Sequence, residues 1–279
     1  MIGLGSNRLT VCRSGGMSVT QAGRGDMEWL GVRYPSWASP YSAQATAALK
    51  AQFPTQWPTI RDYGVAHPEI VPYVNQYPVG WGNIIANYQL CEYVRSTGTQ
   101  YFRIPFNYGG GIKKIVCDYY PDAANVIFSE WKSTSYGGGI SYEHNTDTQV
   151  RAWIGNSTSD WVYLTTSKIR QTAMYKDSKW TINGVLKAEK AQGDIDGISP
   201  YVHICARGLN GNLHAAQKCT IYGFEMQSQQ YGIALYPCYN KTSNVIGIFD
   251  VVNNEFHENA GSGTFLKGSD IYYPGQSPS

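Results

Sequence analysis

Residues 235–265 constrain the fold most, because they read as an antiparallel β-hairpin followed by a glycine-containing loop. Asn253-Asn254 can occupy the left-handed positions of a tight turn, and residues 255–257 then return with alternating polarity. Glycines within 259–263 permit positive φ. The strand before the turn is built from β-branched and aromatic residues, namely Val245, Ile246, Ile248, Phe249, Val251 and Val252. The chain is therefore predicted to end in β-sheet.

Residues 88–106 predict a matching pair of strands near the other end of the same region. Tyr88 and Leu90 point to one side of the first strand, residues 96–99 turn, and residues 100–106 form the second strand. Asp250 in the closing hairpin could bind a metal or act in catalysis. The interpretation we favour is that its carboxylate bonds backbone amides of the turn, as Asp does in many loops.

Short apolar segments fill the interval between these two hairpins. The 22 Tyr, 8 Trp and 30 Gly, with only 15% charged residues, fit short strands joined by glycine turns. Asn183-Gly184 is the strongest hairpin signal, residues 136–139 read as a loop, and 207–215 read as a loop before the next strand. The expected strands are 112–119, 125–131, 149–154, 161–164, 169–175, 180–186, 201–206 and 218–226. With no expected helix between them, they predict an all-β, antiparallel two-sheet sandwich.

The opening stretch 88–101 and the closing stretch 235–265 together resemble the end signatures of a concanavalin A-like (laminin-G-like) jelly-roll domain. Such domains occur in bacteriophage tail and structural proteins and in surface proteins of gut bacteria. The resemblance covers about residues 85 to 270. It implies a lectin-like jelly roll over residues 85–272, followed by a short tail, 273–279. Sugar binding does not follow from the fold alone.

Residues 1–84 differ from the rest in being rich in proline and tryptophan. Only residues 42–53 are predicted to be helical, with Pro54 ending the helix. We expect an irregular N-terminal arm whose Trp29, Trp37 and Trp57 bury against the jelly roll or another subunit. In that interpretation the arm anchors the protein to a partner.

Charge and cysteine content narrow the class of protein. The formal net charge of +2 gives no reason to expect nucleic acid as a partner, and no apolar run could span a bilayer. We expect no secretory signal in the sequence. The six cysteines form no Cys-x-x-Cys pair, which argues against zinc, and we expect most to be reduced thiols in strands, although an even number would also suit a disulfide framework.

A search for catalytic groups finds none that we assign. Glycoside hydrolases of this shape carry paired carboxylates on one strand, and no such run exists here. Asp118 and Asp122 flank a proline turn, while Asp194 and Asp196 lie in a glycine-rich loop, where a solvated turn is the simpler interpretation than a calcium site. The histidines show no metal-pair spacing, and His203 is interpreted as a satisfied strand residue. We predict no catalytic residue, no metal and no cofactor.

Aromatic residues with neighbouring amides are the remaining candidates, because sugar sites stack aromatic rings on pyranose faces and fix hydroxyls with polar side chains. Sheet packing and solvated turns are the competing interpretation for each residue. The candidates in the central region are Tyr136, Tyr142, His144, Asn145, Trp161 and Tyr163.

These observations favour a non-enzymatic virion protein of a bacteriophage, a capsid decoration, fibre or tail component that displays a lectin-like domain for glycan or host binding. Its expected partners are other virion proteins through the arm, a glycan, and copies of itself. The alternatives are a secreted bacterial lectin or adhesin and, less favoured, a glycoside hydrolase with an unrecognised carboxylate pair.

Overall fold

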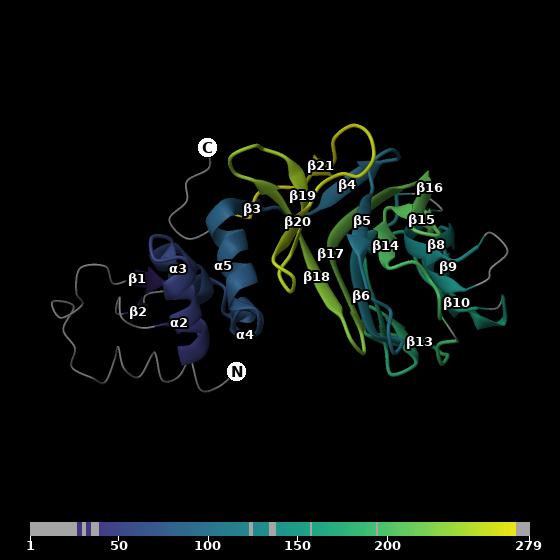
Figure 1. The fold of residues 1–279 in the computed structure, drawn as a ribbon, viewed down its shortest axis with the longest axis horizontal. Coiled ribbons are helices and arrows are strands. Elements are labelled where there is room, and N and C mark those ends of the chain that lie inside the picture. The colour runs from purple at the N-terminus through teal and green to yellow at the C-terminus, as the bar shows by residue number, and fades with distance from the viewer. Residues whose placement is uncertain are drawn as a thin grey trace. The chain divides into compact units, whose positions relative to one another are not determined.

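The computed structural model describes residues 27–29, 32–34, 39–122, 125–133, 138–156, 158–193 and 195–271. The chain divides into two compact units, residues 1–86 with 272–279, and residues 87–271. Helices, coloured purple to blue in Figure 1, dominate the described part of the first unit, and strands build the second.

The second unit is a sandwich of two sheets. The first sheet runs in the order β10-β9-β8-β7-β14-β5, with the β15–β16 hairpin attached to β7. Its strands are β5 (Phe102–Pro105), β7 (Val126–Trp131), β8 (Gly139–Thr146), β9 (Gln149–Gly155), β10 (Trp161–Thr165), β14 (Tyr201–Ile204), β15 (Ala206–Leu209) and β16 (Asn212–Ala216).

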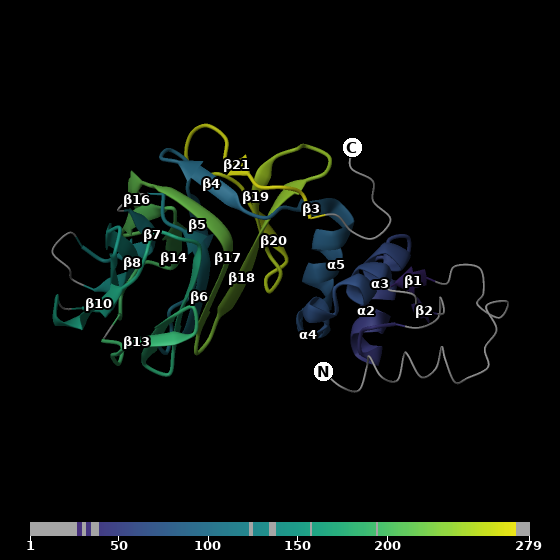
Figure 2. The same cartoon turned by 180° about the vertical axis from the view of Figure 1, so that it is seen from behind.

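The second sheet runs in the order β13-β12-β11-β6-β17-β18-β19-β20, and three short strands join it off this path. Figure 2 shows β17 and β18 of this sheet in a different layer from β8 of the first. Its strands are β3 (Tyr88–Leu90), β4 (Val94–Thr97), β6 (Ile112–Tyr120), β11 (Gln171–Lys176), β12 (Lys179–Ile182), β13 (Val185–Glu189), β17 (Lys218–Ser228), β18 (Gly232–Asn240), β19 (Ile246–Asp250), β20 (Glu255–His257) and β21 (Leu266–Lys267).

Aromatic side chains from both sheets meet in one core. Phe128 of β7 contacts Phe224 of β17 with ring centroids 5.1 Å apart, and Tyr142 of β8 stacks on Trp180 of β12 at 5.6 Å. Burial of such rings is the main stabilising contribution to a fold of this kind. Pairing is antiparallel between the described strands except at one bridge, Leu209 to Trp131. The predicted all-β, two-sheet antiparallel sandwich is confirmed; its concanavalin-type identity stays a prediction.

The structure has strands in two segments for which the sequence predicted none. Residues 139–146 form β8, in the middle of the first sheet, and residues 207–215 fall within the β15–β16 hairpin, which turns at Asn210-Gly211. Both residues of that turn have positive φ, 49° and 77°, which Asn and Gly tolerate. Both segments lack the apolar alternation typical of a strand, because the second half of β8 is Glu143-His144-Asn145-Thr146 and the hairpin carries Arg207 and His214.

The closing hairpin has a longer turn than expected. β19 ends at Asp250 and β20 begins at Glu255, and only the second of the two turn asparagines, Asn254, has positive φ. Asp250 holds this turn: its Oδ1 accepts from the backbone N–H of Ala234 at 3.1 Å and of Val252 at 3.0 Å. The structural role favoured for Asp250 is therefore confirmed.

The first unit is more regular than the sequence indicated. The predicted helix at 42–53 is α2 (Ala43–Gln52), whose first turn is capped by Ser42 Oγ, which accepts from Ala45 N at 3.2 Å. It is accompanied by further helices and by a hairpin of β1 (Met27–Trp29) and β2 (Val32–Tyr34). The prediction of an irregular arm is therefore corrected. The further helices are α3 (Trp57–Ala66), η2 (Pro68–Ile70), α4 (Val71–Gln76) and α5 (Pro78–Asn87).

The prolines explain this error. Each of these further helices carries a proline in its first two positions, where an N–H donor has no partner within the helix anyway. Trp57 is half-buried and contacts the Tyr41 ring at 6.3 Å and the Lys50 ammonium at 5.2 Å, both within its own unit. Trp37 and the side chain of Trp29 lie outside the described part of the chain, so anchoring by the arm stays a prediction.

The cysteines divide into two groups. Cys91, Cys117 and Cys238 are buried free thiols whose pKa values are raised by burial, as expected for small apolar residues. Cys205 and Cys219 form a disulfide that joins the segment between β14 and β15 to β17, and so connects the two sheets. The expectation of reduced cysteines is wrong for this pair, and Cys12 lies outside the described residues.

Candidate functional site

The candidate site lies on the outer face of the first sheet, where polar residues alternate with core residues. Val150 and Ala152 of β9 are fully buried between the sheets, so Arg151 between them points outward. Arg151 lies directly opposite Tyr163 of β10 on one side and Glu143 of β8 on the other. The strand register alone therefore places an aromatic ring, a guanidinium and a carboxylate in one row across three strands.

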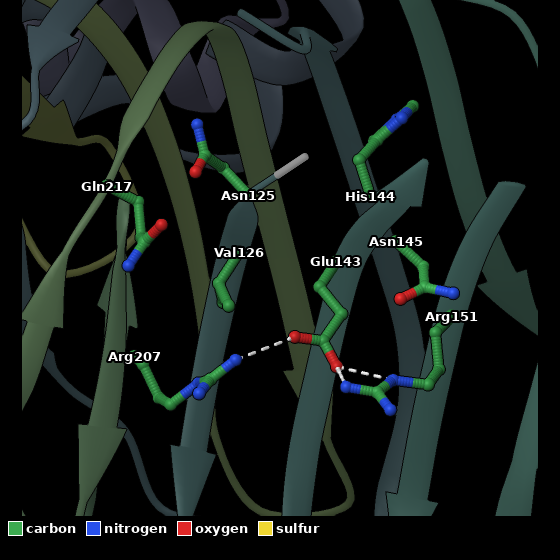
Figure 3. A pocket seen from close by; sticks show the side chains of 8 residues that line it. All are labelled: Asn125, Val126, Glu143, His144, Asn145, Arg151, Arg207 and Gln217. Atoms are coloured by element: carbon green, nitrogen blue, oxygen red, sulfur yellow. Dashed lines mark hydrogen bonds and ion pairs between the residues drawn. The ribbon is translucent and has the colours of Figure 1, made fainter. Parts of the chain in front are cut away.

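Two arginines bind the carboxylate of Glu143 from opposite sides (Figure 3). Arg151 Nε donates to Glu143 Oε1 at 2.6 Å, and Arg207 Nη2 of β15 donates to Oε2 at 3.1 Å. The Glu143 side chain is only 5% exposed, whereas those of Arg151 and Arg207 are 24% and 30% exposed. The two guanidiniums carry one positive charge more than the carboxylate neutralises, and their positions are fixed by charge-assisted hydrogen bonds.

A tryptophan ring makes a cation–π contact with each guanidinium. Arg151 lies over the Trp161 ring at 4.1 Å, and Arg207 lies over the Trp131 ring at 4.7 Å. Trp161 stacks on buried Trp153 at 5.2 Å with an interplanar angle of 17°. Trp161 is half-buried, and Tyr163 is 58% exposed, which is more than any other tyrosine whose side chain the structure describes. The outer face thus presents aromatic surface beside immobilised cations.

A polar pocket of about 160 Å³ opens between the two arginines. The remaining lining residues are mostly neutral and polar, with amides that can both donate and accept hydrogen bonds. They are Asn125, Val126, His144, Asn145 and Gln217. In Figure 3, Asn145 lies on the Arg151 side of Glu143, and Gln217 lies on the Arg207 side. Such a lining suits a small, highly hydroxylated or anionic group.

His144 forms the boundary between this pocket and the core. Its Nε2 shares a hydrogen bond of 2.8 Å with the Tyr119 hydroxyl, and its side chain is buried. Burial lowers the pKa of His144 to about 4, because desolvation penalises the imidazolium form. The residue is therefore neutral at pH 7 and adds no charge to the site.

The structure brings together four of the six residues predicted from the sequence. His144 and Asn145 line the pocket, and Trp161 and Tyr163 lie beside Arg151. Tyr142 is a core residue, fully buried with its hydroxyl 3.1 Å from that of Tyr119, so it offers no surface to a ligand. Tyr136 lies outside the described residues.

The charged residues of the site were missed in the sequence. The alternation of residues 149–154 signals that Arg151 and Trp153 share one face, and it could have identified Arg151. Glu143 and Arg207 gave no signal, because no strand was predicted for the segment of Glu143 and the segment of Arg207 was interpreted as a loop. Of the other carboxylates considered, Asp118 pairs with Arg170 at 2.8 Å, Asp196 is exposed, and Asp194 is outside the described residues. The described residues contain no cluster of three potential metal ligands.

A second carboxylate of the same sheet has a different environment. Glu130 Oε2 is 2.8 Å from His203 Nδ1, both side chains are 0% exposed, and Glu130 Oε1 accepts from Gly211 N at 2.5 Å. Gly208 of β15 packs directly over this pair, because a Cβ there would overlap His203 Nδ1 and Glu130 Oε2. The pair fixes the β15–β16 hairpin on the sheet and thereby positions Arg207, so His203 is more than a satisfied strand residue.

Comparisons with known proteins show only a distant structural likeness. No protein-family profile matches the chain, and no curated protein matches its sequence. Among solved structures, the chain is similar to the CBM40 of the Ruminococcus gnavus IT-sialidase, at 13% identity over 50% of this chain and 93% of that one, with a TM-score of 0.39. The same module bound to α2,3-sialyllactose gives 13% identity, 48% and 89% coverage and a TM-score of 0.36. A likeness of this degree says nothing about function.

No helix within the described residues is long and apolar enough to cross a membrane.

Proposed function

We propose that the sandwich is a non-catalytic glycan-binding module and that the outer face around Glu143 is its binding site. The observation that carries the proposal is the row Tyr163–Arg151–Glu143, with Arg151 held between the Glu143 carboxylate and the Trp161 ring. Tyr163 and Trp161 offer ring surface to the apolar face of a pyranose, and the guanidinium and amide N–H groups beside them suit sugar hydroxyls.

The charge of the site favours an acidic sugar. Two guanidiniums share one carboxylate, so one positive charge remains to attract a ligand carboxylate or sulfate. Guanidinium donors match the planar geometry of a carboxylate, and here stacking on Trp131 and Trp161 holds each fork in place before a ligand arrives. Preorganised donors of this kind lose less conformational entropy on binding.

Hydrolysis is not part of the proposal. Among the described residues that line the pocket, Glu143 is the single carboxylate, and both of its oxygens accept from arginines. Glycoside hydrolysis ordinarily needs two carboxyl groups flanking the scissile bond. A bound glycan is therefore expected to be released unchanged.

We propose the biological context of the module from residues 88–101 and 235–265, which resemble the end signatures of jelly-roll domains found in bacteriophage proteins. In that proposal the chain belongs to a bacteriophage particle and residues 1–84 dock it to other virion proteins. The Cys205–Cys219 disulfide is the one observation that favours the alternative, a secreted bacterial lectin, because stable disulfides are typical of oxidising compartments. Electron microscopy of purified phage particles labelled with an antibody to the chain would separate the two.

The ligand proposal is tested with the full chain on a printed array of neutral and acidic oligosaccharides. We expect binding to acidic structures that weakens as NaCl rises from 50 to 500 mM, because exposed charge interactions are screened. Binding to neutral oligosaccharides alone would contradict the role of the arginines. Binding to none would contradict the glycan proposal.

A further inference from the structure

We propose a second saccharide site on the outer face of the other sheet, with a preference for neutral sugars. A cavity of about 530 Å³ lies over β4, β6 and β17, which is within the usual range for small-ligand pockets and larger than the cavity beside Glu143. It is lined by three tyrosines, Tyr93, Tyr120 and Tyr222, together with Thr220, Lys168 and the ion pair of Arg95 with Asp122.

The strand register places three of the lining side chains side by side. Thr220 of β17 lies directly opposite Tyr120 of β6 on one side and Arg95 of β4 on the other. The neighbouring residues Cys219 and Ile221 are buried in the core, so Thr220 points to the outer face. The row therefore presents a phenol, a hydroxyl and a guanidinium across three adjacent strands.

Neighbouring side chains hold the rings of Tyr93 and Tyr222 in place. Arg170 lies over the Tyr222 ring at 3.7 Å and is itself fixed by two hydrogen bonds to Asp118, of 3.1 and 2.8 Å. Tyr93 contacts Tyr222 edge-on at 5.5 Å. The hydroxyls of the three tyrosines form no hydrogen bond with any described residue, which leaves them for water or a ligand. Half-buried rings with unused hydroxyls suit a sugar, which offers both C–H faces and hydroxyl groups.

The charges of this cavity are balanced, unlike those beside Glu143. Arg95 Nη2 donates to Asp122 Oδ1 at 2.5 Å, and Thr220 Oγ1 donates to Asp122 Oδ2 at 3.0 Å. Asp122 is 8% exposed, whereas Arg95 is 48% exposed, lines the cavity and has further N–H donors besides the one bonded to Asp122. Lys168 also lines the cavity and pairs with Asp147 at 3.4 Å, so both lining cations, Arg95 and Lys168, have a carboxylate partner, and the cavity has no unpaired cation to attract an acidic group. The ligand class that fits is a neutral saccharide of one or two units.

The experiment is a nuclear magnetic resonance titration of the ¹⁵N-labelled full chain with the strongest neutral and the strongest acidic oligosaccharide of the array. We expect the neutral sugar to shift the amides of residues 93–95 and 220–222. The double variant Tyr93→Phe, Tyr222→Phe keeps both rings and removes two hydroxyls, so it should weaken this binding by about fivefold per hydroxyl while the fold is unchanged. Trp161→Ala, at the other face, is the matched control and should leave it unaltered.

The titration can refute the proposal of either site independently of the other. Shifts confined to residues 143–163 for both sugars, abolished by Trp161→Ala, would overturn the second site and leave the first. Neutral-sugar shifts at 93–95 and 220–222, with no response at 143–163 to either the neutral or the acidic sugar, would support the second site and overturn the first. Neutral-sugar binding that the tyrosine double variant does not weaken would overturn the assignment of these hydroxyls.

Discussion

Glu130 and Glu143 lie on neighbouring strands of one sheet, yet their surroundings assign them opposite tasks. Glu130 is sealed under Gly208 with His203 and a backbone amide as partners, and neither side chain reaches solvent. Glu143 is almost as deeply buried, but its partners Arg151 and Arg207 are partly exposed and border a pocket. A buried carboxylate can therefore either fasten a hairpin or position cations for a ligand, and the exposure of its partners distinguishes the two.

The largest expected effect is a loss of stability when the buried Glu130–His203 pair is broken. Glu130→Ala leaves His203 Nδ1 and Gly211 N without an acceptor in a dry environment, and we expect a loss of about 3 kcal/mol in the free energy of unfolding. Urea denaturation monitored by tryptophan fluorescence measures it. The control is Glu189→Ala, which removes an exposed carboxylate paired with Lys179 and should change little. Equal effects of the two substitutions would abolish the distinction drawn between buried and exposed carboxylates.

The buried imidazole of His144, between the pocket and the core, should make the stability of the fold depend on pH. Its pKa is lowered from 6.5 to about 4 by burial, so above pH 6.5 both folded and unfolded states are neutral and stability is complete. As pH falls from 6.5 toward 4, only the unfolded state takes up the proton, and stability falls by roughly 3 kcal/mol in total. His257, whose pKa is also lowered by burial, acts in the same direction.

The variant His144→Gln isolates the contribution of this histidine. It keeps a polar group near the Tyr119 hydroxyl and removes the titration. Urea midpoints at pH 5 and pH 7.5 should differ less in the variant than in the wild type. An unchanged difference would show that His144 is not desolvated as described.

A smaller effect is expected from Gly208→Ala. The added methyl group must displace the hairpin from the Glu130–His203 pair, at a cost of about 2 kcal/mol. Gly223→Ala is the control, since the nearest atom to a Cβ there is 3.8 Å away. Because Arg207 lies next to Gly208, the variant should also weaken glycan binding at the outer face. A thermal unfolding midpoint identical to that of Gly223→Ala would show that the hairpin is not packed against the pair.

Most of the sandwich could be predicted from sequence because its strands combine apolar alternation with glycine and asparagine turns. At Asn183-Gly184, for example, both residues have positive φ, as the motif predicts. Strands that carry several polar residues could not be predicted in this way. Glu143 and His144 are polar in sequence, but partners far along the chain, Arg207 and Tyr119, satisfy them, and no local pattern reveals such partners. For the same reason the sequence did not indicate Glu143 or Arg207, whereas the alternation of residues 149–154 could have revealed Arg151.

The prediction for the first unit was wrong for a different reason. Prolines were interpreted as breaks, whereas Pro58, Pro72 and Pro78 each stand at the start of a helix, where their fixed φ is already helical. Position relative to the helix start, rather than proline content, decides the outcome. That this helical unit anchors the chain to a particle stays a prediction.

The most direct test of the account measures the affinity of Tyr163→Ala for the strongest acidic glycan of the array, by isothermal titration calorimetry. Tyr163 is exposed, so its loss should leave the thermal midpoint unchanged while weakening binding about tenfold, through loss of ring contact with the sugar. Tyr73→Ala, which removes a tyrosine 50% exposed in the first unit, is the matched control and should bind like the wild type. Equal affinity of the two variants would contradict a glycan site on the outer face of the first sheet.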